Sequence, residues 1–398
     1  MPRSTLEVAD VFRAHGQHWR ESHAGHVSLE QLKVMSGIEH CRSEVLGGHV
    51  LHCPACEYTQ IAYNSCRNRH CPKCQASAAK RWLAARQTEL LPVDYYHVVF
   101  TLPQPISELA YYNKSVMYGL LLKAAAKTLL TIGADTKHLG ARLGVTFVLH
   151  TWGSAMTHHP HVHGIIPGGG LSLDGERWVK CKAGFFLPVR VLSRLFRRLY
   201  LEGLREVYEQ NKLLFFGECL SIEEENPFLA WLNNQRNVEW VVYAKRPFAG
   251  PQAVLAYLSR YTHRVAISNS RLVAMDKEAV SFKWKNYRVK EQNRQRTMTL
   301  THDEFIRRFL LHVLPSGFHR IRHYGLTANT GRKKNLDKAR QLLNVNAPTV
   351  PVDKALSDEV KAHEPTPTFV CPCCGAGMIV TDVLLHLYLP RAPPLLVN

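Results

Sequence analysis

The stretch "HHPHVHGIIPGGG" at residues 158–170 places histidines at alternate positions of an apolar run that a glycine-proline cluster ends. His159, His161 and His163 would share one face of a β-strand, with about 6.5 Å between successive histidines. Two imidazoles at that spacing can bind one metal ion. Three in a row span about 13 Å, which is too far for one ion unless Pro160 bends the strand. We therefore predict that His161 and His163 chelate a metal, and that His159 is either a third ligand or a phosphate contact.

A further ligand for this metal has to come from another part of the chain. His97, His150 and His263 are the candidates, and sequence spacing does not choose among them. Nitrogen ligands that leave open positions suit Mn²⁺ and Zn²⁺, and they suit Mg²⁺ where phosphate oxygens complete the coordination shell. The expected metal for chemistry at this site is Mg²⁺ or Mn²⁺.

Two tyrosines follow the histidines in the stretch "AYLSRYTHR". Tyr257 and Tyr261 are four residues apart, so a helix would present both hydroxyls on one face. Such a stripe is also common in helix cores, but Arg260 and Arg264 interleave with it, which favours a surface beside a phosphate. A phenol, with a pKa of about 10, is a weak nucleophile near neutral pH. A metal that polarises a phosphodiester lets a weaker nucleophile attack the phosphorus. The pattern therefore predicts attack of a tyrosine on a DNA phosphate.

The chain is strongly basic, with 50 Lys and Arg against 32 Asp and Glu and a formal net charge of +18. Such a surplus favours a nucleic-acid partner. The N-terminus "MPRSTLEVADVFRAHGQHWR" lacks the apolar core of a signal peptide, and no stretch approaches about 20 uninterrupted apolar residues. We therefore expect a cytoplasmic protein that associates with the nucleoid when bound to DNA, and no membrane partner.

The 11 cysteines cluster near the two ends of the chain. In a reducing compartment, paired spacings indicate metal more often than disulfides. "CPAC" at 53–56 and "CPKC" at 71–74 form two CxxC turns, which together can complete a tetrahedral zinc site. The spacing predicts Zn²⁺ bound by four thiolates, those of Cys53, Cys56, Cys71 and Cys74.

Other cysteines allow two interpretations. Cys41, Cys66 and His70 either build a second zinc site or are packing residues, and Arg67 and Arg69 beside them are candidate DNA contacts. At the C-terminus, "CPCCG" contains one CxxC but no second pair. Its three thiols are either exposed in a tail or bind zinc with His386 or His363, and they are Cys371, Cys373 and Cys374.

The order of the predicted elements indicates an α+β fold with a central antiparallel sheet. Strands are expected at 95–103, 145–153, 161–167 and 238–248, a helix at 113–133, a helical insertion at about 184–238, and a hairpin at 271–287. The expected organisation is a zinc-binding module at 1–90, a catalytic domain at 91–326, a linker at 327–370, and a C-terminal cysteine knuckle and tail at 371–398.

Several motifs together resemble the rolling-circle, two-tyrosine HUH transposases of bacterial insertion sequences. They are "HPHVHGIIPGGG", "YLSRYTHRVAIS", "YNSCRNRHCPKCQ" and "GFHRIRHYG", and the resemblance runs from about residue 35 to 330. It implies an HUH nuclease fold behind an N-terminal zinc-binding domain. It also implies metal-dependent nicking and rejoining of single-stranded DNA at the element ends and at target DNA, with a tyrosine joined to the 5′-phosphate.

By this resemblance His161 and His163 are metal ligands, and Tyr257 and Tyr261 are nucleophiles. One departure from the family pattern is Ser154, which follows Trp-Gly where Gln or Asn is expected. If that amide contributes to binding of the metal or the DNA, this chain lacks the contribution.

A basic stretch near the end of the predicted catalytic domain is a candidate single-strand contact. Arg320 and Arg322 alternate with aromatic residues in "GFHRIRHYG", and cations beside aromatic rings suit phosphate neutralisation and base stacking. A solvated basic face is the alternative.

Two other functions compete with this interpretation. One is a zinc-ribbon DNA-binding protein without catalysis, in which the tyrosines belong to the core. The other is a carboxylate-based two-metal transposase, which needs three acidic residues in a motif that the sequence does not show.

Overall fold

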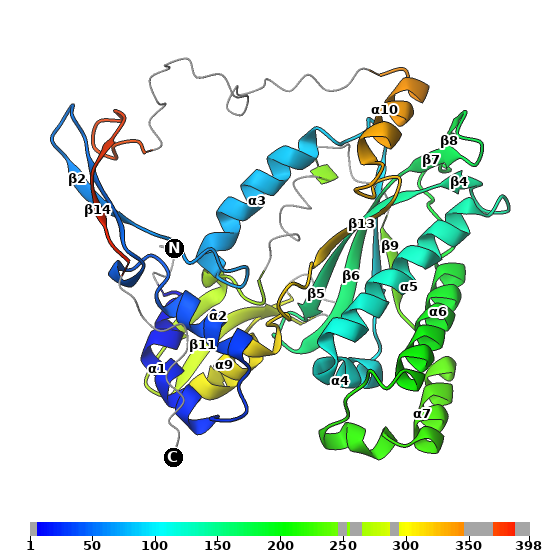
Figure 1. Ribbon diagram of the computed structural model, residues 1–398, viewed down its shortest axis with the longest axis horizontal. Coiled ribbons are helices and arrows are strands. Elements are labelled where there is room, and N and C mark those ends of the chain that lie inside the picture. Colours follow the sequence, from blue (N-terminus) through cyan, green and yellow to red (C-terminus); the bar gives the residue numbers. More distant parts are fainter. Residues whose placement is uncertain (1–5, 246–252, 255–264, 287–293, 346–368, 387–398) are drawn as a thin grey trace. The chain divides into compact units, whose positions relative to one another are not determined.

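The computed structural model describes residues 6–245, 253–254, 265–286, 294–345 and 369–386 (Figure 1). It has an α+β architecture built on antiparallel sheets, which confirms the predicted fold class. Five residues of predicted function lie outside the described ranges, namely Tyr257, Tyr261, Arg260, Arg264 and His263, and so does His363.

The chain divides into two compact units, and neither is continuous in sequence. The first comprises Met1–Ala78, Ile267–Val313 and Thr349–Asn398, and the second comprises Ala79–Ala266 and Leu314–Pro348. The expected boundaries after residues 90, 326 and 370 therefore differ from the observed ones. The reason is strand pairing between distant segments, which local composition does not reveal.

The second unit is organised around a five-stranded antiparallel sheet with strand order β13-β5-β6-β3-β9. The strands in chain order are β3 (Tyr95–Thr101), β5 (Gly144–Trp152), β6 (His158–Pro167), β9 (Val242–Lys245) and β13 (Ile321–Gly325). β5 and β6, which cover two of the predicted strands, form an antiparallel hairpin, and β3 pairs with the other side of β6. The histidine strand therefore lies in the middle of the sheet.

Helices pack on one face of this sheet. They are α4 (Gln104–Tyr112), α5 (Lys114–Ala134), α6 (Val189–Glu209) and α7 (Glu225–Asn237), with a 3₁₀ turn η2 (Gly217–Ile222) between the last two. α5 has the length and composition of a membrane span, with a mean hydropathy of 1.3, but 61% of that window is buried inside the protein. Figure 1 shows α5 and α6 side by side along the sheet, so α5 is the central core helix of this unit.

The predicted insertion at 184–238 forms α6 and α7, and its apolar side chains belong to the main core. Phe196 packs edge-on against Phe100 of β3 at 4.9 Å and against Trp240 at 5.4 Å, measured between ring centroids. All three side chains are almost fully buried. The segment therefore closes one side of the sheet instead of being an appendage to it.

Two smaller features complete the second unit. One is a sheet of β4 (Ala141–Arg142), β7 (Gly169–Ser172) and β8 (Trp178–Lys180). The other is helix α10 (Arg332–Leu342), which lies inside the expected linker. Leu336 and Ala339 of α10 are buried against Leu91 and Leu326. The linker interpretation was wrong for this part, because an apolar pair three residues apart anchors an otherwise basic segment.

The first unit has a helical part and a cysteine-rich part. The helical part combines α1 (Val8–Ser22), α2 (Leu29–Glu39) and α9 (His302–Leu311) with the 3₁₀ turn η3 (Asn269–Arg271) and a sheet of β10 (Leu272–Met275), β11 (Ala279–Lys285) and β12 (Gln295–Thr301). Phe12 meets Phe309 at 5.3 Å, and Phe282 meets Phe305 at 6.0 Å. The predicted hairpin at 271–287 thus forms, but it packs with the N-terminal helices.

The cysteine-rich part contains η1 (Glu44–Leu46), a sheet with strand order β14-β1-β2, and the start of helix α3 (Pro72–Gln87). β1 (Gly48–His52) and β2 (Thr59–Tyr63) form a hairpin, and β14 (Ile379–Leu384) pairs antiparallel with β1. The two ends of the chain therefore share one small sheet.

The packing of Phe196 generates a stability prediction. Replacing Phe196 by Ala should lower the free energy of unfolding by about 3–5 kcal/mol, because a buried aromatic side chain is lost and a cavity remains. Arg198→Ala is the matched control on the same helix, since the Arg198 side chain is 67% exposed in a 3.6 Å ion pair with Glu202. It should change stability by less than about 1 kcal/mol. Urea unfolding measures both, and equal effects would show that α6 is not part of the core.

Candidate functional site

The pairing of β5 with β6 brings three histidines together. His150 of β5 lies opposite His161 of β6, and Val148 lies opposite His163. The side chains of His150, His161 and His163 each offer a ring nitrogen, and these nitrogens all lie within 4.8 Å of one another. Three convergent imidazoles are a donor set that fits one divalent metal ion with positions left open. Of the two candidate ligands that the structure describes, His97 and His150, His150 joins this group, and His263 lies outside the described residues.

The alternation of β6 explains why its histidines share a face. Val162 and Ile166 point into the core beneath α5, so His161 and His163 point to the opposite face. Gly164 also faces the core, where a Cβ atom would come within 2.6 Å of the Phe147 ring. The residue after the HxH motif is therefore small because the aromatic ring of the neighbouring strand occupies its space.

Hydrogen bonds orient two of the rings. Nδ1 of His161 lies 2.7 Å from the backbone oxygen of His159. Since a carbonyl only accepts, Nδ1 carries the hydrogen and Nε2 keeps the lone pair for a metal. His159 thus contributes its backbone here, and its side chain is not among the three convergent imidazoles. No bend at Pro160 is needed, because the partner strand provides the third ring.

His97 supports the group from β3. Its Nε2 lies 2.8 Å from Nδ1 of His163, which leaves Nε2 of His163 as the nitrogen available for a metal. Burial lowers the pKa of His97 to about 4, with a further contribution from the positive charge of Lys245. His97 is therefore neutral near pH 7 and acts as an orienting partner of His163.

An aromatic contact holds the third ring. The imidazole of His150 stacks on the indole of Trp152, with ring centroids 4.7 Å apart and an angle of 19° between the planes. His150 is almost fully buried. The sequence signal for this ligand was weak, because a single histidine at the end of an apolar strand is most often structural, and only the strand register identifies it.

Eight of the 11 cysteines form two groups of four. Cys41, Cys66, Cys71 and Cys74 make one group, and Cys53, Cys56, Cys371 and Cys374 make the other. Sγ of Cys74 lies 3.6 Å from Sγ of Cys41, and Sγ of Cys53 lies 3.5 Å from Sγ of Cys374. Four thiolates around a zinc ion at 2.3 Å are separated by about 3.8 Å, whereas a disulfide is about 2.05 Å long. Both groups therefore fit a tetrahedral zinc ion.

This grouping corrects the single four-cysteine site expected from spacing. The turn with Cys53 and Cys56 lies at the end of the β1–β2 hairpin, and the pairing of β14 with β1 brings the C-terminal CxxC to it. The second turn, at the start of α3, meets Cys41 and Cys66 instead. His70 is not a member of either group, and Cys373 is exposed outside them. The Cys66 thiol lowers the pKa of Cys41 to about 7, which favours a thiolate there.

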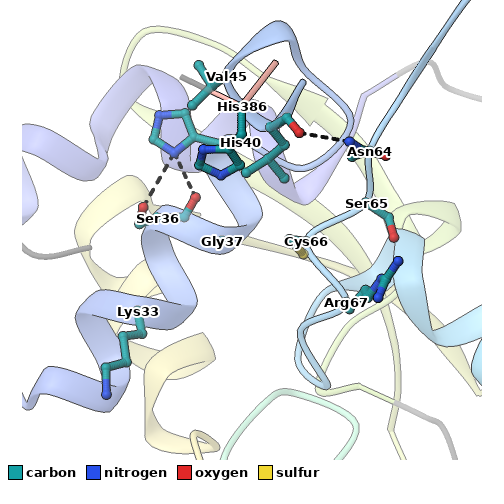
Figure 2. Close-up of a pocket in the computed structure, with 11 residues that line it drawn as sticks. Lys33, Ser36, Gly37, His40, Val45, Asn64, Ser65, Cys66, Arg67 and His386 are labelled. Carbon is teal, nitrogen blue, oxygen red and sulfur yellow. Dashed lines mark hydrogen bonds between the residues drawn. The ribbon is translucent and has the colours of Figure 1, made fainter. Parts of the chain in front are cut away.

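A cavity of about 1060 Å³ adjoins the first cysteine group (Figure 2). Lys33 of α2 and Arg67 lie on its walls, together with His40, Asn64 and His386. His40 is fixed by a 2.9 Å contact between its Nδ1 and the backbone oxygen of Ser36. Arg67 has a left-handed backbone with φ of 52°, which turns the chain between the cysteines.

The other predicted DNA contacts within the described residues are less open than Arg67. Arg69 is half-buried, and burial lowers its pKa while the charge of Glu30 opposes that shift. Arg320 is buried, with its backbone oxygen accepting from the backbone nitrogen of Leu149 at 2.8 Å. The guanidinium of Arg322 lies over the ring of Phe318 at 4.9 Å. This last pair shows the predicted combination of a cation and an aromatic ring.

A family model described as "Transposase zinc-binding domain" matches residues 11–102, and one described as "Putative transposase" matches residues 144–335. The chain is 52% identical over 384 residues to "Putative transposase y4qJ" of Sinorhizobium fredii (strain NBRC 101917 / NGR234), covering 96% of each protein. It is 25% identical over 360 residues to "Transposase for insertion sequence element IS801" of Pseudomonas savastanoi pv. phaseolicola, covering 87% of this chain and 82% of the relative.

Among solved structures, "Conjugative Relaxase TrwC in complex with OriT Dna. Metal-free structure." aligns with a TM-score of 0.24 and 12% identity, over 63% of this chain and 72% of that one. The sequence relatives confirm the family expected from the motifs. The chain belongs to the IS91/IS801 family of insertion-sequence transposases and carries their N-terminal zinc-binding domain.

Proposed function

We propose that this transposase nicks and rejoins single-stranded DNA at the ends of its element by metal-dependent attack of a tyrosine. The observation that carries the proposal is the convergence of His150, His161 and His163 on one face of the central sheet. A Mg²⁺ or Mn²⁺ ion held there would polarise the phosphodiester and offset the charge that develops on its oxygens. Zinc, in contrast, suits the two closed four-cysteine groups.

The chemistry assigned to Tyr257 and Tyr261 balances as a transesterification. The phenol gives up its proton and its oxygen forms a bond to phosphorus, the bond from phosphorus to the 3′-oxygen breaks, and that oxygen takes up a proton. The products are a 5′-phosphotyrosine and a free 3′-hydroxyl. Attack of another 3′-hydroxyl on the phosphotyrosine reverses these steps and rejoins the strands. Two tyrosines allow one to hold a cut end while the other attacks.

The adduct is the direct test of this proposal. The purified protein with a labelled single strand that contains an element end, and with Mg²⁺ or Mn²⁺, should give an adduct that resists SDS. Tyr257→Phe or Tyr261→Phe should reduce the adduct, and the double variant should abolish it, because the phenolic oxygen forms the bond. Tight binding without an adduct under either metal would instead favour a zinc-ribbon DNA-binding protein without catalysis.

The proposed metal ligands can be tested without DNA. His150→Ala should weaken Mn²⁺ binding by more than about 100-fold, because a direct ligand should cost more than the 10- to 100-fold typical of an outer-shell partner. His159→Ala is the matched control, since the His159 ring is not one of the three convergent imidazoles and the variant keeps the backbone oxygen that accepts from His161. It should change Mn²⁺ affinity by less than about threefold. Calorimetric titration of the zinc-loaded protein measures both, and equal losses would contradict the observed grouping.

The proposed zinc sites predict a stoichiometry of two ions per chain. Cys371→Ser and Cys41→Ser should each reduce it to one, because each variant removes one thiolate from a different four-cysteine group. Cys373→Ser, which alters an exposed thiol outside both groups, should leave two. Elemental analysis after gel filtration gives the count. If Cys371→Ser kept the zinc content of the unaltered protein, the result would instead support the site expected from spacing, formed by Cys53, Cys56, Cys71 and Cys74.

A further inference from the structure

Strand β9 is the edge of the five-stranded sheet among the described strands, and it pairs with β3. Its alternate residues Val242 and Ala244 pack into the main core beneath the sheet. Val241 and Tyr243 must therefore point to the opposite face. Their side chains are 61% and 53% exposed, which is unusual for large apolar groups in a strand of a central sheet.

The strand register places these residues on the face of the three histidines. Tyr243 lies opposite Val99 of β3, and Val99 lies opposite His163 of β6. Directly opposed residues of antiparallel strands point to the same face, and neighbouring strands are about 4.8 Å apart. Tyr243 is thus two strands, or about 10 Å, from a proposed metal ligand.

A cation adjoins the exposed ring on the same face. Lys245 follows Tyr243 by two residues and lies opposite His97, the partner of His163. Because opposed residues of antiparallel strands point to the same face, Lys245 lies on the face that carries Tyr243 and the histidines. The row of histidines thus continues into an aromatic ring and a cation at the sheet edge.

This combination matches the chemistry of single-stranded DNA. Unpaired bases stack on exposed aromatic rings, and cations beside them neutralise the backbone phosphates. A duplex offers no free base face, and the net charge of +18 favours a polyanion and disfavours a cationic peptide as the natural occupant. The position next to the histidines places such a base close to a phosphate held at the metal.

We propose that Tyr243 is a positioning residue that stacks on a base of the single strand near the scissile phosphate, with Lys245 contacting the backbone beside it. The proposal rests on the proposed nicking function, because it takes the histidine cluster as the place where the phosphate is bound. It assigns the ring of Tyr243, and not its hydroxyl, as the functional group.

The test compares binding of a fluorescent single strand from the element end without added Mg²⁺ or Mn²⁺. Tyr243→Ala should weaken binding about 5- to 150-fold, since stacking of one base contributes about 1–3 kcal/mol. Tyr243→Phe, which keeps the ring, should bind within about twofold of the unaltered protein. Phe185→Ala removes another exposed ring of the same unit, 49% exposed, and should also leave binding unchanged. Lys245→Gln should reduce the salt dependence by about one phosphate contact.

A series of single-stranded DNAs, each with one abasic site, identifies the stacked base. Abasic sites are moved along the single strand, and at one position the loss should equal that of Tyr243→Ala, with no further loss when the two changes are combined. The proposal is overturned if Tyr243→Ala binds like the unaltered protein, if Tyr243→Phe falls as far as Tyr243→Ala, or if duplex binding falls equally. Failure of the unaltered protein to form a tyrosine adduct would overturn the nicking function. The binding measurements test the role of Tyr243 independently, because they need no adduct. Thermal unfolding checks that the variants are folded.

Discussion

The antiparallel pairing of β5 with β6 is the interaction on which the rest of the histidine site depends. It sets His150 opposite His161, and it leaves the other side of β6 to β3, whose His97 then meets His163. A shift of one residue would turn the histidines of β6 into the core. The register is held because Val162, Gly164 and Ile166 fit beneath the helices only on the opposite face. Packing of the core therefore determines the geometry of the chemistry.

A different constraint acts in the cysteine-rich part of the chain. The sheet of β14, β1 and β2 has a small core, with the buried cluster Leu51, Cys53, Cys371 and Met378, and most of β14 is exposed. So little apolar area cannot stabilise a sheet that joins segments more than 300 residues apart, since Cys53 and Cys374 are 321 residues apart in sequence. The proposed zinc ion would supply that stability, because metal binding free energy is folding free energy in small modules.

The two faces of the central sheet have separate tasks. One face is covered by α5 and α6 and carries the aromatic contacts of Phe100, Phe196 and Trp240. The other carries the histidines, and at its edge the exposed side chains of β9. Because side chains alternate along each strand, Val162 packs into the core while its neighbours His161 and His163 lie on the other face. The proposed DNA path follows from this alternation as much as from net charge.

The sequence by itself determined features that depend on local spacing: the strand that carries His161 and His163, their common face, the core helix at 113–133, the CxxC turns, the basic charge and the family. Only the tertiary structure decided which distant segments meet. His150 became a ligand candidate through strand register, Cys371 and Cys374 joined Cys53 and Cys56 through β14, and 267–313 joined the N-terminal unit. Periodicity and turn spacing depend on neighbouring residues, whereas pairing between segments depends on the packing of the whole chain. Local patterns therefore left the pairing of distant segments open.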